Sequence, residues 1–368
     1  MNILIVAVIF SALIVIHEFG HYLIAKRSGV KVEKFALGFG PVLFKLKGKE
    51  TEFLFCAFPL GGYVKLAGDT RSEHKGFGYE FLSKPIGVRS KIVFAGPMFN
   101  YLLALILFCI IATIGFPYPD SVVGSVLKDY PAETAGVKAG DRVLAVDGKK
   151  VENWADMAAI IYRAKDKVKL RIEREGKITS LDIALCQKEI TDDFGKKKDV
   201  SIVGIAASSE VKIVKYGFPQ NLIKGAEALL NLTFLVIKGF ILMILGIIPF
   251  KEAVAGPVGI YYITSEMVKI GIVATLHLVA ALSVSLAVIN LFPIPVLDGG
   301  HLLFFFLEKL RGTPLSERTE EALTRLGFGF LILLIAFVFY NDIVRFGPKI
   351  WNKNKDLKPE AIISQEDD

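Results

Sequence analysis

Four stretches of this sequence approach the length of apolar chain that a membrane-spanning helix needs, and they constrain the fold more than any other feature. They are residues 3–25, 92–116, 272–291 and 327–340 with its flanks. About 20 apolar residues cross the ~30 Å hydrocarbon core of a bilayer. The composition agrees, since 53% of the residues are apolar and 22% are charged. The sequence therefore predicts a polytopic α-helical membrane protein with four transmembrane helices, and it excludes a disordered protein and a disulfide scaffold.

The charged segments between these stretches predict the orientation of the chain. Residues 26–91 carry 13 Lys and Arg against 6 Asp and Glu, which places them in the cytoplasm by the positive-inside tendency. Residues 117–224 then lie outside, because long domains translocate largely regardless of charge. The net charge of +7 does not indicate a nucleic-acid partner, because the basic residues flank the apolar stretches and form no single stripe. We expect the lipid bilayer to be the protein's surroundings.

Residues 117–207 differ from the rest, because short β-rich runs alternate there with turn signals such as Asp147-Gly148. The runs are residues 121–126, 142–146, 167–173 and 178–185. The stretch from Tyr130 to Gly148 looks like part of a PDZ domain of the kind found in envelope proteases. That resemblance implies a groove that receives an extended peptide or a chain end by strand addition. A β-rich spacer without a ligand is an equally weighted alternative.

The first apolar stretch contains His17-Glu18-Phe19-Gly20-His21. Residues four apart share one face of a helix, so His17 and His21 can present two imidazoles to one metal ion. Glu18 is placed to take a proton from water at that ion. Ionisable groups cost about 2.5–3.5 kcal/mol each at the bilayer centre, and a divalent cation would offset that cost. The weaker alternative is a set of polar side chains that face a wet groove.

A catalytic zinc site needs a third protein ligand, and Asp298 is the best candidate. It follows Pro293 and Pro295, which break the helix, and precedes two glycines. Irregular backbone at membrane depth survives only where protein or water surrounds it. A turn-capping role is the lesser alternative for Asp298. Other candidates rank lower: His301 as a substitute ligand, His277 as a packing or interfacial residue and His74 as a loop residue.

Asp298 can reach the depth of His17 only if the third span runs in the same direction as the first. The apolar run at residues 228–250, which carries Asn231 and Lys238, must then not cross the membrane. We expect this run to lie on the surface or to dip in and return.

The combination of HEFGH on the first span, a PDZ insert and NLFPIPVLDGG at residues 290–300 resembles the site-2 protease family of intramembrane zinc metalloproteases, peptidase family M50B. Within it, the chain is most similar to the bacterial RseP group, which cleaves anti-sigma factors and remnant signal peptides. The resemblance implies that His17, His21 and Asp298 bind Zn2+ and that Glu18 is the general base. It also implies that Asn290 positions the substrate backbone.

Two further segments resemble family elements. Gly96-Pro97 with Asn100 matches one of them, and Asn100 either contacts substrate or is a polar group satisfied against neighbouring helices. Residues 34–65 match a membrane-dipping β-hairpin whose edge could hold an unwound substrate. The chain departs from members with two tandem PDZ modules, because it carries one.

These inferences define five predicted regions. They are an N-terminal membrane half at residues 1–116, an extracytoplasmic PDZ domain at 117–207, a linker with the surface or re-entrant helix at 208–271, a C-terminal membrane half at 272–346 and a polar tail at 347–368. The predicted function is a zinc metalloendopeptidase of the bacterial inner membrane that cleaves transmembrane segments of single-span proteins. Its active site would lie towards the cytoplasmic side. The rival functions, a membrane-anchored PDZ adaptor and a metal transporter, explain the intact HEFGH motif and the apolar second span less well.

Overall fold

The computed structural model describes residues 2–191, 197–208 and 210–355, and the chain divides into two compact units. Unit 1 combines Met1–Cys109, Gly225–Phe240 and Pro249–Asp368, and unit 2 combines Ile110–Lys224 and Ile241–Ile248. Of the predicted polar tail at residues 347–368, residues 356–368 lie outside the described residues.

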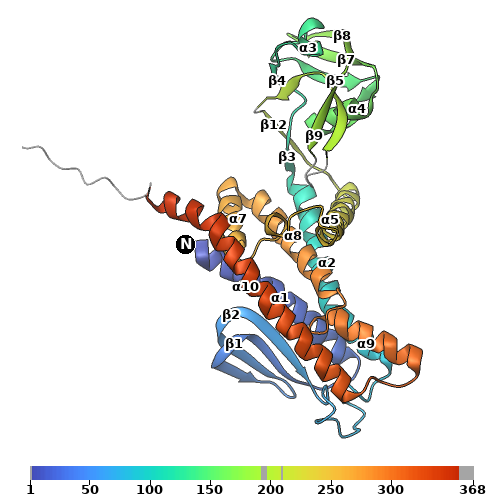
Figure 1. Ribbon diagram of the computed structural model, residues 1–368, viewed down its shortest axis with the longest axis vertical. Coiled ribbons are helices and arrows are strands. Elements are labelled where there is room, and N and C mark those ends of the chain that lie inside the picture. Colours follow the sequence, from blue (N-terminus) through green and yellow to red (C-terminus); the bar gives the residue numbers. More distant parts are fainter. Residues whose placement is uncertain (1, 192–196, 209, 356–368) are drawn as a thin grey trace, which may run out of the picture. The chain divides into compact units, whose positions relative to one another are not determined.

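Long apolar helices dominate unit 1 (Figure 1). The four predicted spans lie in α1 (Asn2–Arg27), α2 (Ile86–Ile114), α8 (Ile272–Asn290) and α10 (Glu317–Lys355). Among the described residues, these four and α5 (Gln220–Ile244) are the helices long and apolar enough to cross a membrane. Three shorter helices complete the set: α6 (Phe250–Ala253), α7 (Pro257–Ile270) and α9 (Asp298–Arg311).

Helix α5 is long enough to cross a membrane, but polar residues recur along one of its faces. Its polar residues Lys224, Glu227, Asn231 and Lys238 are three, four and seven positions apart, which places them on one helix face. A polar stripe on an otherwise apolar helix is typical of helices that lie in the membrane interface. That α5 does not cross the membrane stays a prediction.

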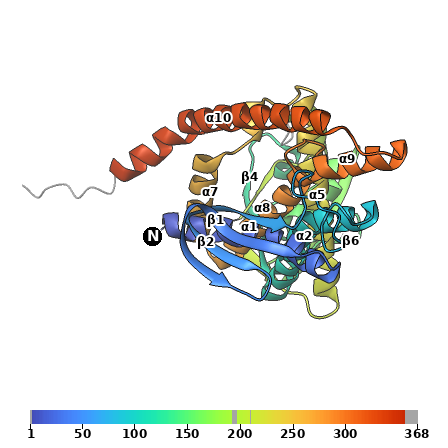
Figure 2. The same ribbon diagram turned by 90° about the horizontal axis from the view of Figure 1, so that it is seen from below.

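The predicted hairpin is a pair of strands that each fold back on themselves. β1 (Val32–Lys47) and β2 (Glu52–Leu66) pair antiparallel. Phe35 nevertheless has two partners, Phe53 and Val64, because both halves of β2 flank the first part of β1. Gly38 and Gly40 permit the bend in β1, with φ angles of +90° and +86°, which other residues rarely adopt. The sheet lies against α1, as Figure 2 shows from below.

A buried apolar cluster joins the C-terminal end of α1 to this sheet. It contains Ala25, Val30, Val32, Leu66, Phe81, Ile92, Val93 and Phe305. These residues come from α1, the loop before β1, both strands, the loop after β2, α2 and α9. The cluster therefore fixes the helix that carries His17 and His21 against the elements that surround it.

Unit 2 is a β-rich domain with its own core. Its strands are β3 (Phe116–Pro119), β4 (Val123–Val126), β5 (Arg142–Val146), β6 (Lys149–Lys150), β7 (Lys167–Arg174), β8 (Lys177–Ala184), β9 (Cys186–Thr191), β10 (Lys197–Ile202), β11 (Ile205–Ala207) and β12 (Val211–Val214). Strands β6, β5, β7 and β8 form one sheet in that order, and the others pair as β9–β10, β4–β11 and β3–β12. The four predicted β runs thus form β4, β5, β7 and β8. Two helices, α3 (Pro131–Thr134) and α4 (Trp154–Arg163), accompany them.

A buried ion pair ties the sheet of unit 2 to the loop before β5. Arg174 donates two hydrogen bonds of 2.7 Å to the carboxylate of Asp141, and the backbone N–H of Lys138 donates a third of 2.8 Å. Burial raises the pKa of the Asp141 carboxyl, but these hydrogen bonds outweigh it and hold the pKa below its ordinary value. The ionised form of Asp141 is therefore part of the folded domain.

Candidate metal centre

The two histidines of the HEFGH motif meet on one face of α1. The Nε2 atoms of His17 and His21 are 3.2 Å apart, and the two rings are nearly perpendicular, at 82°. The four-residue spacing of a helix produces this meeting without any help from the rest of the chain.

Asp298 reaches the same place from a distant part of the chain. It is the first residue of α9 and follows an irregular loop after α8. Gly299 allows that loop to close tightly, because a Cβ there would lie 2.3 Å from the carbonyl oxygens of Leu291 and Phe292. The carboxylate oxygen Oδ2 of Asp298 lies 3.1 Å from His17 Nε2 and 3.6 Å from His21 Nε2.

These three atoms fit a tetrahedral metal site. Ligands at 2.0–2.2 Å from one zinc ion lie about 3.3–3.6 Å from each other, and the observed separations are 3.1, 3.2 and 3.6 Å. Oδ2 of Asp298 is buried and makes no hydrogen bond of acceptable geometry, although His17 Nε2 is near it. A buried carboxylate oxygen without a proton donor is costly. The Nε2 atoms of His17 and His21 and the Oδ2 atom of Asp298 can thus direct a lone pair each at one point. A cation bound at that point would accept all three lone pairs.

The ring nitrogens that face away from this point have partners on α2. Nδ1 of His21 lies 2.9 Å from the carbonyl oxygen of Ile92, a contact in which the ring N–H donates. Nδ1 of His17 lies 3.3 Å from the side-chain amide of Asn100. Metal-binding histidines usually donate their second ring N–H to such an acceptor, which fixes the tautomer and the ring orientation.

Two glycines let α1 and α2 approach closely enough for these contacts. A Cβ on Gly20 would lie 2.4 Å from the carbonyl oxygen of Ala95, and one on Gly96 would lie 2.3 Å from His21 Nε2. Gly20 thus makes room for the backbone of α2. The steric role of Gly96 was not foreseen from the sequence, because it depends on how the two helices pack.

Glu18 lines a cavity of about 1370 Å³ that also contains His17, His21 and Asp298. Its Cγ lies 3.3 Å from the position that a Cβ on Gly62 would occupy, so β2 approaches the carboxylate closely. Because β2 lies on the cavity wall at residues 62–66, a substrate chain beside this strand would pass Glu18 and the candidate ligands.

The remaining candidates lie in different places. Asn290 lines the same cavity, and so does His301, but the ligand atoms within 4.8 Å of one another belong to His17, His21 and Asp298. His277 packs edge-to-face against Phe108, with ring centroids 5.6 Å apart. His74 lies 2.9 Å from the hydroxyl of Ser83 in the loop after β2. Asn100 is fully buried.

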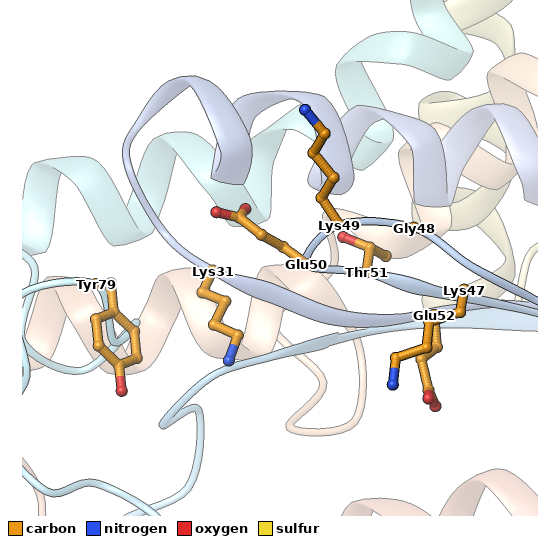
Figure 3. A pocket seen from close by; sticks show the side chains of 8 residues that line it. All are labelled: Lys31, Lys47, Gly48, Lys49, Glu50, Thr51, Glu52 and Tyr79. Atoms are coloured by element: carbon orange, nitrogen blue, oxygen red, sulfur yellow. The ribbon is translucent and has the colours of Figure 1, made fainter.

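A smaller cavity of about 520 Å³ lies at the turn between β1 and β2. Figure 3 shows that Lys49 and Glu50 point to one side of the strands, whereas Lys31 and Tyr79 lie on the other. Its lining includes three lysines and two glutamates, and these side chains do not converge on one point. The metal chemistry therefore belongs to the larger cavity.

The family pattern of Peptidase family M50 matches residues 5–334 of the sequence. This chain belongs to peptidase family M50. A relative from Rhizobium meliloti (strain 1021), named as a zinc metalloprotease, is 35% identical over 349 residues that cover 90% of this chain and 93% of that protein. Another from Clostridium acetobutylicum, also so named, is 33% identical and covers 93% of this chain and 97% of that protein.

The regulator of sigma-W protease RasP from Bacillus subtilis (strain 168) is 29% identical over 422 residues, covering 92% of this M50 chain and 97% of RasP. The predicted membership of the site-2 protease family and the predicted zinc metalloprotease activity are therefore confirmed. Among solved structures, the PDZ domain of an SdrC-like protein from Listeria monocytogenes is 27% identical, with a TM-score of 0.20, and covers 24% of this chain and 88% of that domain.

Proposed function

We propose that this M50 peptidase hydrolyses peptide bonds within the transmembrane segments of single-span membrane proteins. The observation that carries the proposal is the convergence of His17, His21 and Asp298 at α1, which carries both histidines and is long and apolar enough to cross a bilayer. A soluble protease would not need its metal-binding motif on such a helix.

His17, His21 and Asp298 would hold one zinc ion, which when bound polarises the scissile carbonyl and lowers the pKa of water. Glu18 would act as general base, taking the proton of the attacking water and passing it to the leaving amine. Its place on the cavity wall beside β2 supports this role. Asn290, on the same cavity wall, would position the substrate backbone.

The edge of β2 at residues 62–66 would receive the substrate as an added strand. A transmembrane helix keeps its carbonyl groups in internal hydrogen bonds, so the substrate must unwind before a peptide bond can be attacked. Substrates with helix-destabilising residues near the cleaved bond would therefore be favoured.

The proposal also covers the membrane in which the protein acts and the partners that it binds. The protein would span the bacterial inner membrane, with unit 2 outside and the metal centre towards the cytoplasm. The PDZ-like domain would bind a peptide or chain end of the substrate or of a regulator. Since the relative RasP is named a regulator of sigma-W protease, anti-sigma factors and remnant signal peptides are the substrate classes to test first.

The test is cleavage of a helical single-span substrate by the detergent-purified protein, with and without a zinc chelator. We expect cleavage that the chelator abolishes and that added zinc restores. Cleavage that is insensitive to the chelator would contradict the proposed metal chemistry, and cleavage only outside the apolar segment of the substrate would contradict an intramembrane site.

A further inference from the structure

The contact between Asn100 and His17 raises a question about the direction of its hydrogen bond. Nδ2 of Asn100 lies 3.3 Å from Nδ1 of His17, while Oδ1 of the same amide is buried without a hydrogen-bond partner. If the amide N–H donates to Nδ1, the ring proton must sit on Nε2. His17 could not then bind a metal through Nε2, the atom that faces His21 and Asp298.

The opposite orientation of the amide removes this conflict. The two ends of a side-chain amide have nearly the same shape, so either can face the imidazole. With Oδ1 towards His17, the amide oxygen accepts the Nδ1–H proton, and the lone pair of Nε2 points at the candidate metal position. His21 already has this arrangement, since its Nδ1 faces the carbonyl oxygen of Ile92 at 2.9 Å.

We propose that Asn100 is a positioning residue for the metal centre, holding His17 in the tautomer and orientation that leave Nε2 free to bind zinc. Its side chain is 0% exposed and lies outside the lining of the catalytic cavity. Direct contact with substrate, one of the two roles considered from the sequence, is therefore the weaker explanation. This inference rests on the proposed function, because it assigns Asn100 a role at the same zinc site.

The surroundings of Asn100 suit such a role. The hydroxyl of Ser283 on α8 donates a 2.9 Å hydrogen bond to the backbone oxygen of Asn100. Asn100 therefore lies between the helix that carries His17 and the helix that leads to Asp298, and its backbone is held from α8. Asn100 therefore contacts α1, which supplies two of the ligands, and α8, which precedes the loop to Asp298.

Three variants of the full-length protein separate positioning from packing. Asn100→Leu keeps the approximate volume but removes the acceptor, Asn100→Asp keeps an acceptor for the Nδ1–H of His17, and Ser283→Ala removes a neighbouring buried hydrogen bond without touching the ring. The measurement is zinc affinity of the detergent-purified proteins by competition with a chromophoric chelator. Thermal unfolding of the zinc-free proteins reports any general loss of structure.

We expect Asn100→Leu to weaken zinc binding by about 10–100-fold, as loss of an outer partner of a metal-binding histidine usually does. Asn100→Asp and Ser283→Ala should stay within about threefold of the wild-type protein. Equal zinc affinity in Asn100→Leu and the wild type would overturn the positioning role, and so would equal losses in all three variants. A wild-type protein that binds no zinc would instead refute the proposed function itself.

Discussion

Glu18 differs from its neighbours in the motif because it lines the cavity without belonging to the group of converging ligand atoms. Glu18 is therefore placed to act as a base, whereas His17 and His21 are placed to bind the metal. Replacing Glu18 with Gln preserves its size and the metal ligands but removes the base. We expect Glu18→Gln to retain zinc while cleavage falls by at least about 100-fold, the lower end of what general base catalysis contributes. The checks are zinc content and the initial rate of substrate cleavage; an active variant would refute the assignment.

Gly96 makes a second residue-scale prediction. A Cβ there would lie 2.3 Å from His21 Nε2 and 2.8 Å from His17 Cε1, so Gly96→Ala should displace the imidazoles or force α1 and α2 apart. We expect loss of most zinc binding and cleavage. Gly329→Ala in α10 is the matched control, because nothing lies within 4 Å of its added Cβ. Zinc titration of both variants decides the matter, and normal affinity in Gly96→Ala would contradict the close packing.

Much of the metal centre could be predicted from the sequence, for a reason specific to each residue. His17 and His21 meet because of helix periodicity alone, and Asp298 could be inferred because few ionisable groups occur at membrane depth. Gly96 and the contact of Asn100 with His17 could not be derived, because they depend on the distance and rotation between α1 and α2. No local pattern in the sequence sets these quantities.

At the scale of elements, Asp342 links the last long helix to the start of α7. Its carboxylate is 0% exposed and accepts hydrogen bonds from the backbone N–H groups of Gly256, at 3.0 Å, and Gly259, at 2.7 Å. Helix α7 packs in turn against α1, α8 and α10. A single side chain on α10 therefore anchors a helix that contacts the one carrying His17.

Asp342→Ala would leave two buried N–H groups without acceptors, at a cost of about 1–3 kcal/mol each. We expect a clear fall in the thermal unfolding temperature and faster proteolysis near residue 256. Asn341→Ala is the control, because Asn341 is only half-buried and its 2.8 Å hydrogen bond to the carbonyl oxygen of Lys251 is exposed, so water can replace it. Equal stability of the two variants would show that Asp342 is no anchor.

Two features of the helices and strands could not be predicted from the sequence: the fold-back of β1 and β2, and the full length of α10. The resemblance to a family element predicts a β-hairpin at residues 34–65, but the fold-back of both strands depends on backbone angles at Gly38 and Gly40 and on packing against α1. Helix α10 extends from Glu317 to Lys355, well beyond the apolar stretch at 327–340, because charged residues at its ends are also good helix formers.

For the whole molecule, the proposed topology requires α1 and α8 to cross the membrane in the same direction, with α5 not crossing between them. In a protein whose native cysteines are replaced by serine, Lys215→Cys and Lys251→Cys flank α5 at exposed positions. Both should react with a membrane-impermeant maleimide added to intact cells. Lys49→Cys in the β1–β2 turn should react only after permeabilisation. If Lys251→Cys behaved like Lys49→Cys, α5 would cross the membrane and the proposed topology would be wrong.

The zinc K-edge X-ray absorption spectrum of the purified protein would report directly whether His17, His21 and Asp298 bind one ion. We expect a four-coordinate ion with two imidazole nitrogens at about 2.0–2.1 Å, oxygen ligands at about 2.0–2.2 Å and no sulfur. Asp298→Ala should change the oxygen shell and leave the imidazole scattering in place. Sulfur in the wild-type shell, or a spectrum that Asp298→Ala leaves unchanged, would contradict the convergence of His17, His21 and Asp298 on one ion.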